Sequence, residues 1–393
     1  MKDTNAGQKQ NTGTGVKTSQ IYALMKKAKN YENRIELGRG DPDFDTPEPV
    51  LIKTEANLSG SKADQIPVEG IFDLREAIAE RVERINGIKV DPETEVIVTN
   101  GGQEALFMMV QSVIDKNDEI ILPEPNYNTY KDAINFAGGV RIGIPTRREE
   151  SFRVDPRLVE KAVTPRTRAI VLASPNNPSG AVISPEDHRE FVAIAEHHDL
   201  KILSDEIYDY FVYGDLEHIS PANLPGGRER TITLNAVSKK YAMCGWRTGW
   251  LVGDAELIKP IKELKAAING GTSLISQLGA LSALNTDDSE ILGMKKSLIR
   301  RRTIVMKSLD RINIPYGIPQ GGQFIFADIS SLKMGSLAFC EWILENCQVL
   351  LYPGATFGID FDNYLRITFL QNESMLEEAM GRIEQLFKKE GLC

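Results

Sequence analysis

The sequence predicts an α/β protein built around a mostly parallel sheet, followed by a smaller α+β domain. Between residues 92 and 253, seven short apolar runs typical of strands alternate with longer amphipathic segments typical of helices. This alternation favours a largely parallel sheet. Beyond residue 289 the sequence pattern changes: long segments typical of helices surround one glycine-rich region typical of a strand. At 393 residues, the chain is long enough for about two domains.

Each predicted element rests on its own pattern. The strands are short runs rich in Val, Ile and Leu, at residues 95–99, 119–123, 141–145, 168–173, 200–205, 231–236 and 250–253. The helices carry apolar residues three or four positions apart, at residues 102–114, 184–198, 290–312 and 374–389. The uncharged stretch 266–286 is too polar to span a bilayer. We expect it to form a helix that is buried inside the protein or at a subunit interface.

The composition and the apolar pattern of the sequence divide the chain into three segments. We expect an N-terminal arm with part of the small domain at 1–45, a large α/β domain at 46–288 and a C-terminal small domain at 289–393. The first twenty residues are polar and lack the apolar stretch of a signal peptide. The four cysteines form no CxxC pair, which favours a reducing compartment. We therefore expect a cytoplasmic protein.

Charge and histidine spacing argue against several classes of function. A net charge of -9 and a pI near 5.3 are unfavourable for a surface that binds nucleic acid. His197 and His198 are adjacent in the sequence and cannot share one helix face, so we expect them to be surface residues. The remaining expectation is a small-molecule enzyme without a metal, and with neither nucleic acid nor membrane as a partner.

Polar side chains follow several of the predicted strands directly. Ligands of parallel sheets gather at the carboxyl ends of strands, so these positions are candidate site residues. Gly101 and Gly102 lead into a helix whose N-terminus suits a phosphate, Asp205 ends a strand, and Asn177 lies in a proline-fixed loop. Each has a simpler explanation when taken alone: a tight turn, a helix cap, or, for Lys239, a solvated basic turn.

Together these residues meet the needs of one cofactor. Pyridoxal 5′-phosphate requires a lysine for a Schiff base, an acid beside its ring nitrogen, donors for its phenolate oxygen and an anion site for its phosphate. The residues that supply these groups, in the same order, are Lys239, Asp205, Tyr208 with Asn177, and Gly102 with Arg247. All of them follow strands of the one predicted sheet.

The same residues lie in motifs through which the chain resembles a fold-type I aminotransferase of class I and II, over nearly everything after the N-terminal arm. In the family's order, the matching motifs read GRGDPDFDTP, GIFDLREAIA, TNGGQEAL, PEPNYNTY, SPNNPSG, SDEIYDYF, SKKYAMCGWRTGW and NYLRITF. The resemblance implies a large domain with a mostly parallel seven-stranded sheet and a smaller α+β domain. It also implies a homodimer with shared active sites that converts an L-α-amino acid to its 2-oxo acid.

The resemblance also implies a role for each matching residue. The implied catalytic residues are Lys239, Asp205 and Tyr208. The implied cofactor-binding residues are Gly101, Gly102, Gln103, Tyr127, Asn177, Asp205, Tyr208, Ser238, Lys239 and Arg247, with Lys239 forming the Schiff base, Tyr127 stacking on the ring and Arg247 binding the phosphate. The implied substrate-binding residues are Gly40, Asn177 and Arg366, with Arg366 gripping the α-carboxylate. Spacing to Arg247 selects Lys239 over Lys240, which we expect to be a solvated neighbour.

Three positions depart from the family's pattern. Gln65 stands where a tyrosine usually reaches the neighbouring subunit's cofactor phosphate, Ala236 where Gly or Ser is usual, and Thr248 where an aliphatic residue is usual. Two alternatives to transamination therefore stay open: lyase, decarboxylase or oxygen-dependent oxidase chemistry on the same scaffold, and a cofactor-sensing regulatory domain. The retained Lys239 favours catalysis over the second. No residue of the sequence marks a pocket for a particular substrate side chain.

Overall fold

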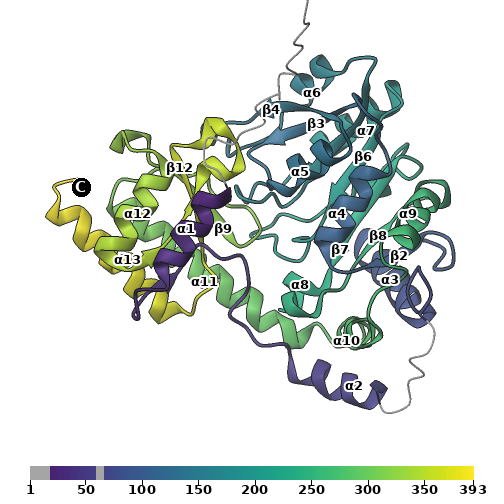
Figure 1. Ribbon diagram of the computed structural model, residues 1–393, viewed down its shortest axis with the longest axis horizontal. Coiled ribbons are helices and arrows are strands. Elements are labelled where there is room, and N and C mark those ends of the chain that lie inside the picture. Colours follow the sequence, from purple (N-terminus) through teal and green to yellow (C-terminus); the bar gives the residue numbers. More distant parts are fainter. Residues whose placement is uncertain (1–17, 59–65) are drawn as a thin grey trace, which may run out of the picture.

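The computed structural model describes residues 18–58 and 66–393, and its main sheet has seven strands (Figure 1). Their order is β2-β8-β7-β6-β5-β3-β4. The strands are β2 (Val96–Thr99), β3 (Glu119–Glu124), β4 (Val140–Pro145), β5 (Thr167–Ala173), β6 (Lys201–Asp205), β7 (Thr231–Ala236) and β8 (Gly249–Val252). Only β8 runs antiparallel to its neighbours, and the other pairs are parallel. The predicted fold class is confirmed.

Helices cover both faces of this sheet, and alternate residues of the central strands explain why. Ile120 packs toward α4 (Gly102–Gln111), α5 (Thr129–Phe136) and α9 (Ala255–Ile268), whereas Ile121 packs toward α6 (Pro156–Ala162) and α7 (Pro185–His197). Val171 and Ile170 divide in the same way. Strands buried on both faces read as continuous apolar runs, which is the pattern that predicted them. Next to α6 and α7, helices α3 (Phe72–Asn86) and α10 (Leu274–Leu284) cover β2 and β8.

A second group of elements packs beside the sheet and carries the C-terminal residues (Figure 1). Its antiparallel sheet has the order β11-β12-β9, with β9 at Phe324–Asp328, β11 at Tyr352–Pro353 and β12 at Tyr364–Thr368. The helices around it are α11 (Ser289–Arg311), α12 (Ser336–Cys347) and α13 (Glu373–Lys389). The N-terminal part of the chain joins this group: β1 (Ile35–Glu36) pairs in parallel with β10 (Val349–Leu350), and α1 (Thr18–Ala28) packs on the same core.

The stretch 266–286 differs from its prediction as one buried helix. It contains the end of α9, a loop, and α10, because the chain turns at Gly270 with a φ of +66° that glycine adopts freely. The side chain of Asn269 accepts a hydrogen bond from the Gly271 amide and stabilises the turn. The α10 half is largely buried and packs against α2 (Glu48–Leu58). No described helix combines the length and the apolarity that a membrane crossing requires.

Candidate active site

A cleft of about 1010 Å³ opens at the carboxyl ends of β5, β6 and β7. Its walls come from the main sheet on one side and from β1, β9, β11 and β12 with their loops on the other. It brings together all the predicted site residues except Gly101, which directly precedes one of them: Gly40, Gly102, Gln103, Tyr127, Asn177, Asp205, Tyr208, Ser238, Lys239, Arg247 and Arg366 line it. Residues that lie far apart in the sequence therefore meet in one cavity of substrate size.

Lys239 presents its amine to this cleft from α8 (Val237–Lys240), the single helical turn after β7. Its Nζ donates to the carbonyl oxygen of Gly40 at 2.6 Å. The Sγ atom of Cys244 lies 3.7 Å from Nζ, and the nearest carboxylate oxygen, Oδ1 of Asp41, lies 4.0 Å away. The amine is thus held by a carbonyl and not by a close ion pair.

Lys240 is buried, contrary to the prediction that it is a solvated neighbour. Its side chain is only 4% exposed, and its Nζ lies 2.7 Å from Oδ1 of Asp288. The rings of Tyr210 and Tyr241 lie 4.9 and 5.2 Å from the ammonium group. Burial lowers the pKa of Lys240 from its ordinary value, and Asp288 opposes that change. Consecutive residues of a helix lie about 100° apart, so the two lysines leave the turn on different sides.

Asp205 ends β6 at the floor of the cleft, from which it is partly accessible. Each carboxylate oxygen has one donor: Oδ1 accepts from the Ile207 amide at 3.2 Å, and Oδ2 accepts from the hydroxyl of Tyr130 at 3.0 Å. Burial raises the pKa of Asp205 to about 6, against the effect of these two hydrogen bonds. The sequence interpretation missed Tyr130, although it stands three residues after Tyr127 in the same motif, PEPNYNTY.

Tyr208 and Asn177 stand beside Asp205 in the cleft wall. Tyr208 is buried and packs edge-on against Phe324, with ring centroids 5.3 Å apart. Burial raises the pKa of its phenol well above the ordinary value, so it remains a donor at neutral pH. The Oδ1 atom of Asn177 accepts from Nη1 of Arg366 at 3.1 Å, which leaves the amide nitrogen of Asn177 to face other groups.

A cradle for an anion lies at the N-terminus of α4. Gly101 has a φ of +84°, and a Cβ atom built on it would lie 2.7 Å from Nη2 of Arg247. Arg247 is held over this turn by bonds from Nη1 to the Cys244 carbonyl at 2.9 Å and from Nη2 to the Asn100 carbonyl at 3.4 Å. Exposed amides at a helix N-terminus beside a guanidinium group favour a phosphate. Only glycine permits this close approach.

A buried ion pair fixes the turn beneath the cradle, and the sequence interpretation did not include it. The carboxylate of Glu104 accepts from the Asn100 amide at 2.6 Å and from Nζ of Lys265 at 3.1 Å. Lys265 is fully buried and also donates to the side chains of Asn269 and Thr272. Although burial opposes its charge, the bonds from Asn100 and Lys265 lower the pKa of Glu104. The Glu104–Lys265 ion pair therefore supports the cradle, and the charge of each residue is balanced by the other.

Arg366 projects from β12 into the far wall of the cleft and is 7% exposed. Its Nη2 donates to the Gly38 carbonyl at 2.7 Å, and no described residue accepts from its buried Nε. Three rings surround the guanidinium carbon at 4.7 to 5.1 Å: Tyr352, Phe324 and Phe357. An immobilised guanidinium with a free N–H fits an incoming carboxylate. Gly38 supports Arg366 here, whereas the predicted Gly40 contacts Lys239.

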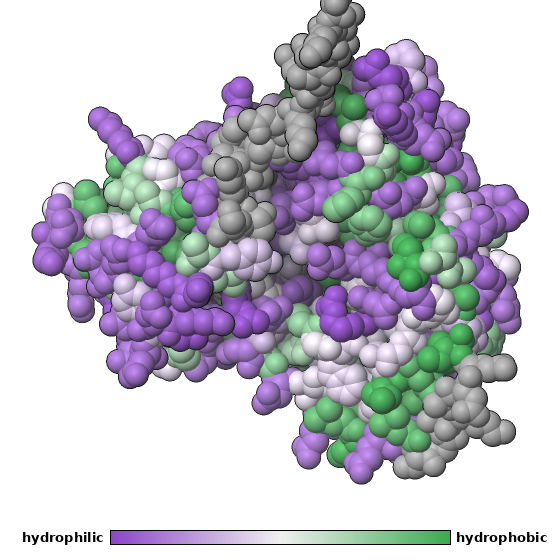
Figure 2. Space-filling model, in the orientation of Figure 1, coloured by the Kyte–Doolittle hydropathy of each residue, from purple (hydrophilic) through white to green (hydrophobic). Residues whose placement is uncertain are grey.

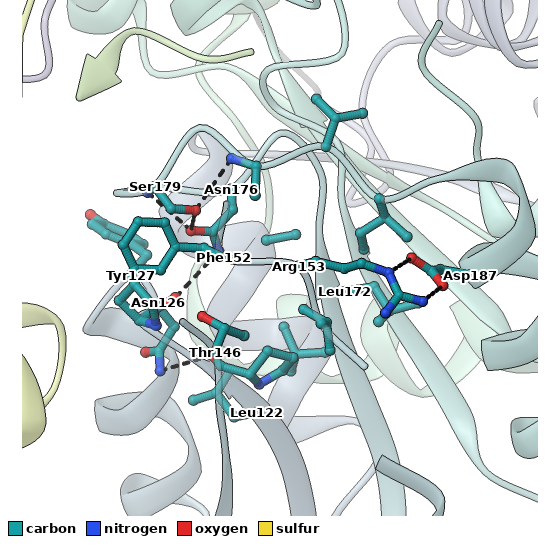
Figure 3. A pocket seen from close by; sticks show the side chains of 18 of the residues that line it. Leu122, Asn126, Tyr127, Thr146, Phe152, Arg153, Leu172, Asn176, Ser179 and Asp187 are labelled. Carbon is teal, nitrogen blue, oxygen red and sulfur yellow. Dashed lines mark hydrogen bonds and ion pairs between the residues drawn. The ribbon is translucent and has the colours of Figure 1, made fainter. Parts of the chain in front are cut away.

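Tyr127 separates the cleft from a smaller neighbouring pocket, because it lines both (Figure 3). The smaller pocket has a volume of about 30 Å³, room for about two water molecules. Phe152 lies beside Tyr127 at one end, and the ion pair of Arg153 with Asp187 closes the other (Figure 3). The pocket is too small for a substrate, so we assign ligand binding to the cleft alone.

Two of the three departures from the family's pattern can be described. Ala236 is buried at the end of β7, and its amide is bonded to the side chain of Asn235 at 2.8 Å. Thr248 is fully buried, and its hydroxyl donates to the Ser276 carbonyl of α10 at 3.0 Å. A polar group thus stands in an apolar position with its hydrogen bond satisfied. Gln65 lies outside the described residues.

The fold is that of fold-type I aminotransferases. The solved structure of an aromatic aminotransferase from Pyrococcus horikoshii OT3 matches with a TM-score of 0.89 and 35% sequence identity, covering 94% of this chain and 100% of that one. The family model described as aminotransferase class I and II matches residues 32–383. The chain belongs to this family and is an enzyme that transfers nitrogenous groups.

Curated relatives in this family carry names for different substrates. An aromatic-amino-acid aminotransferase 2 of Thermococcus litoralis is 37% identical over 96% of this chain and 97% of its own length. An aspartate aminotransferase of Pyrococcus abyssi is 35% identical, with the same two coverages. These names favour transamination over lyase, decarboxylase or oxidase chemistry. They do not agree on one amino acid.

Proposed function

We propose that this aminotransferase holds pyridoxal 5′-phosphate in the cleft, with Lys239 as the attachment point, and converts an L-α-amino acid to its 2-oxo acid. The observation that carries the proposal is the meeting of Lys239, Asp205 and Arg247 around one cleft. The family uses this cofactor, and the residues present fit it. In particular, the Arg247 guanidinium fills the space above Gly101 that a side chain would take, as a phosphate cradle requires.

Each residue around the cleft has one task in this proposal. When bound, the cofactor supplies an electron sink that makes the Cα hydrogen of an amino acid acidic. Nζ of Lys239 would act as the base that takes the proton from Cα and then as the acid that gives it back. The Asp205 carboxylate holds a proton on the ring nitrogen. Tyr208 and Asn177 donate to the phenolate oxygen.

The remaining residues orient the two ligands. Arg247, Ser238 and the amides of Gly101 to Gln103 bind the phosphate, and Tyr127 stacks on the ring. Arg366 binds the α-carboxylate through its guanidinium group, whose Nε has no acceptor among the described residues, with Asn177 beside it. Gly40 lets the backbone approach the same carboxylate. The amino group then passes to a second 2-oxo acid, which closes the cycle.

We also propose a homodimer with shared active sites. Apolar side chains are exposed on α2 and α10, including Leu51 at 46%, Ile52 at 60% and Ile275 at 58%. Figure 2 shows apolar surface over this region, at the lower right of the view. Exposed apolar clusters of this kind mark interaction surfaces. Light scattering on the purified protein tests this, and a monomer at micromolar concentration would contradict it.

Two further proposals concern organisation and location. We propose the domain division 1–45, 46–288 and 289–393, supported by the pairing of β1 with β10, which ties the N-terminal segment to the C-terminal part. A cytoplasmic location is supported by the four cysteines, all of which are free thiols. Limited proteolysis tests the first proposal, because cuts should fall at the boundaries. Cell fractionation tests the second.

A chemical label tests the attachment point and the reaction together. Borohydride treatment of the purified enzyme should fix the cofactor on the peptide that contains Lys239, and mass spectrometry of the digest should identify that residue. Incubation with amino acids and a 2-oxo acid should yield a new 2-oxo acid in equal amount to the new amino acid. Ammonia or peroxide release in place of that exchange would contradict the proposal, and so would a label on Lys240.

A further inference from the structure

Among the residues that the structure describes, Tyr130 is the one side chain that hydrogen-bonds the Asp205 carboxylate. Its hydroxyl donates to Oδ2 at 3.0 Å, while the Ile207 amide donates to Oδ1 at 3.2 Å. One donor on each oxygen fixes both the position and the plane of the carboxylate. The Ile207 donor is a backbone amide, which a change of side chain does not remove. Of the two donors, Tyr130 is therefore the one that a side-chain substitution can remove.

The phenol itself is held in place from all sides. Tyr130 is 1% exposed and lies in the first turn of α5, with its amide bonded to the Tyr127 carbonyl at 3.1 Å. Its ring belongs to the apolar core between the main sheet and helices α4 and α5. One short segment therefore supplies two groups: Tyr127 toward the cleft, and Tyr130 toward the carboxylate at the cleft floor.

We propose that Tyr130 is a positioning residue that keeps the Asp205 carboxylate ionised and oriented toward the ring nitrogen of the cofactor. This role rests on the proposed function, because it needs a cationic ring opposite Asp205. A hydrogen bond donated to the charged form of a carboxyl favours that form, whereas burial disfavours it. Tyr130 thus opposes the effect of burial at the one carboxylate that must be charged at the cleft floor.

Of the charged and titratable groups near Asp205, we expect Asp205 itself to be the one that gains or loses a proton in the test. Burial raises the pKa of Tyr130 well above the ordinary value, and Asp205 adds to that, so the phenol stays a donor across the accessible pH range. Glu206, the residue that follows β6, raises the pKa of Asp205 by its charge. On the cleft side, the titratable or charged residues that line the same cleft include Tyr127, Tyr208, Lys239, Cys244, Asp41, Arg247 and Arg366.

The test measures pyridoxal 5′-phosphate binding by the cofactor-free protein between pH 5 and 8, using the absorbance of the bound cofactor. Affinity of the natural protein should fall as the pH drops through about 6, the pKa of Asp205. In Tyr130→Phe this loss should begin about one pH unit higher, because the carboxylate loses a donor. Asp205→Asn should abolish the loss in that pH range.

The matched control is Tyr213→Phe, which removes another buried tyrosine hydroxyl that is bonded elsewhere, at 2.5 Å from the Gly322 carbonyl. It should lower the melting temperature and leave the pH dependence of binding unchanged. If Tyr130→Phe behaves like this control while Asp205→Asn still abolishes the loss, Tyr130 is structural and the inference is wrong. If the natural protein binds no cofactor, the proposed function is overturned and the role of Tyr130 with it. If Asp205→Asn keeps the loss, a group other than Asp205 controls the pH dependence and the inference about Tyr130 is wrong, while the proposed function stands.

A second measurement covers the case in which Tyr130→Phe is poorly folded. The double variant Tyr130→Phe with Asp205→Asn removes the carboxylate together with its donor, so no buried charge is left unpaired. Loss of the Tyr130 hydroxyl should then reduce the melting temperature less in the Asp205→Asn background than in the natural one at pH 8. Equal reductions in both backgrounds would contradict the coupling of Tyr130 to the ionised carboxylate.

Discussion

Charged residues on the cleft side of β6 and β7 differ from those on the packed side in the partners that they have. On the packed side, three ion pairs join Glu206 to His218, Lys240 to Asp288, and Arg81 to Asp209. On the cleft side, Asp205, Lys239 and Arg366 are hydrogen-bonded to neutral groups of the described residues. The cleft groups therefore keep charges that a charged ligand can pair.

The neighbours Asp205 and Glu206 make the contrast quantitative. Glu206 accepts from four side chains, at 2.6 to 3.0 Å: Asn86, Ser204, Ser220 and His218. Although burial opposes its charge, His218 and the hydroxyl donors lower the pKa of Glu206. Burial raises the pKa of Asp205 to about 6, because two donors do not offset it. The charge of His218 together with the additional donors therefore lowers the pKa of Glu206, whereas Asp205 has no cationic partner that offsets its burial.

Separate alanine substitutions of the two lysines should give the largest difference in turnover. Lys239→Ala should reduce turnover by about 10⁴-fold, because it removes both the attachment point and the group that moves the Cα proton. Lys240→Ala should retain turnover and lower the free energy of unfolding by about 2 kcal/mol, since it removes contacts with Asp288 and two rings. Steady-state kinetics and denaturant titrations check both. An inactive, stable Lys240→Ala enzyme would reverse the assignment.

Substitutions of the neighbours Asp205 and Glu206 should separate effects on turnover from effects on stability. Asp205→Asn should reduce turnover about 10³-fold and stabilise the cofactor-free protein at pH 8 by up to about 3 kcal/mol, because ionised Asp205 is unfavourable above its folded pKa of about 6.

Glu206→Gln should do the opposite. It should destabilise the protein by about 2 kcal/mol at pH 8 and retain most of the turnover. The lowered pKa of Glu206 means that its stabilisation is present above the ordinary value of 4.5 and is lost as the pH falls. Thermal melts of both variants at pH 5 and pH 8 provide the comparison. The same sign of change for both at pH 8 would contradict the contrast.

The two buried arginines should differ in the kinetic constant that they affect. Arg366→Ala should raise KM for amino acids about 100-fold and change KM little for the corresponding amines that lack a carboxylate. Arg81 lies over the Trp250 ring and is paired with Asp209 at 2.5 Å, so Arg81→Ala should destabilise the protein and leave KM unchanged. Equal losses for amino acids and amines in Arg366→Ala would indicate a structural arginine.

The smallest expected effect concerns Thr248 on the packed side. Thr248→Val removes the hydroxyl bonded to the Ser276 carbonyl and should cost about 1 kcal/mol of stability. The products should stay the same, because the hydroxyl points to α10 and away from the cleft. An assay for ammonia beside the 2-oxo acid checks this. A change in the partition between those products would mean that Thr248 steers the reaction.

The sequence was sufficient for the fold, because buried parallel strands such as 168–173 read as unbroken apolar runs with a polar residue at the end. The candidate residues follow from the same rule, since strand ends meet at one edge of the sheet. Lys240 was misjudged because two of the groups that surround it, Asp288 and Tyr210, are distant in the sequence. The Glu104–Lys265 pair was missed for the same reason: its partners are 161 residues apart.

The pairing of β1 with β10 also affects how the chain is made. Ile35 lies opposite Val349, so the first strand must wait for about 300 further residues, roughly 15–60 s at typical rates of protein synthesis. During that interval Gly38, which later accepts a hydrogen bond from Arg366, has no arginine to support. A nascent chain interrupted before β12 would therefore carry Lys239 and Asp205 without a carboxylate site, and its first strand would present an unpaired edge to chaperones.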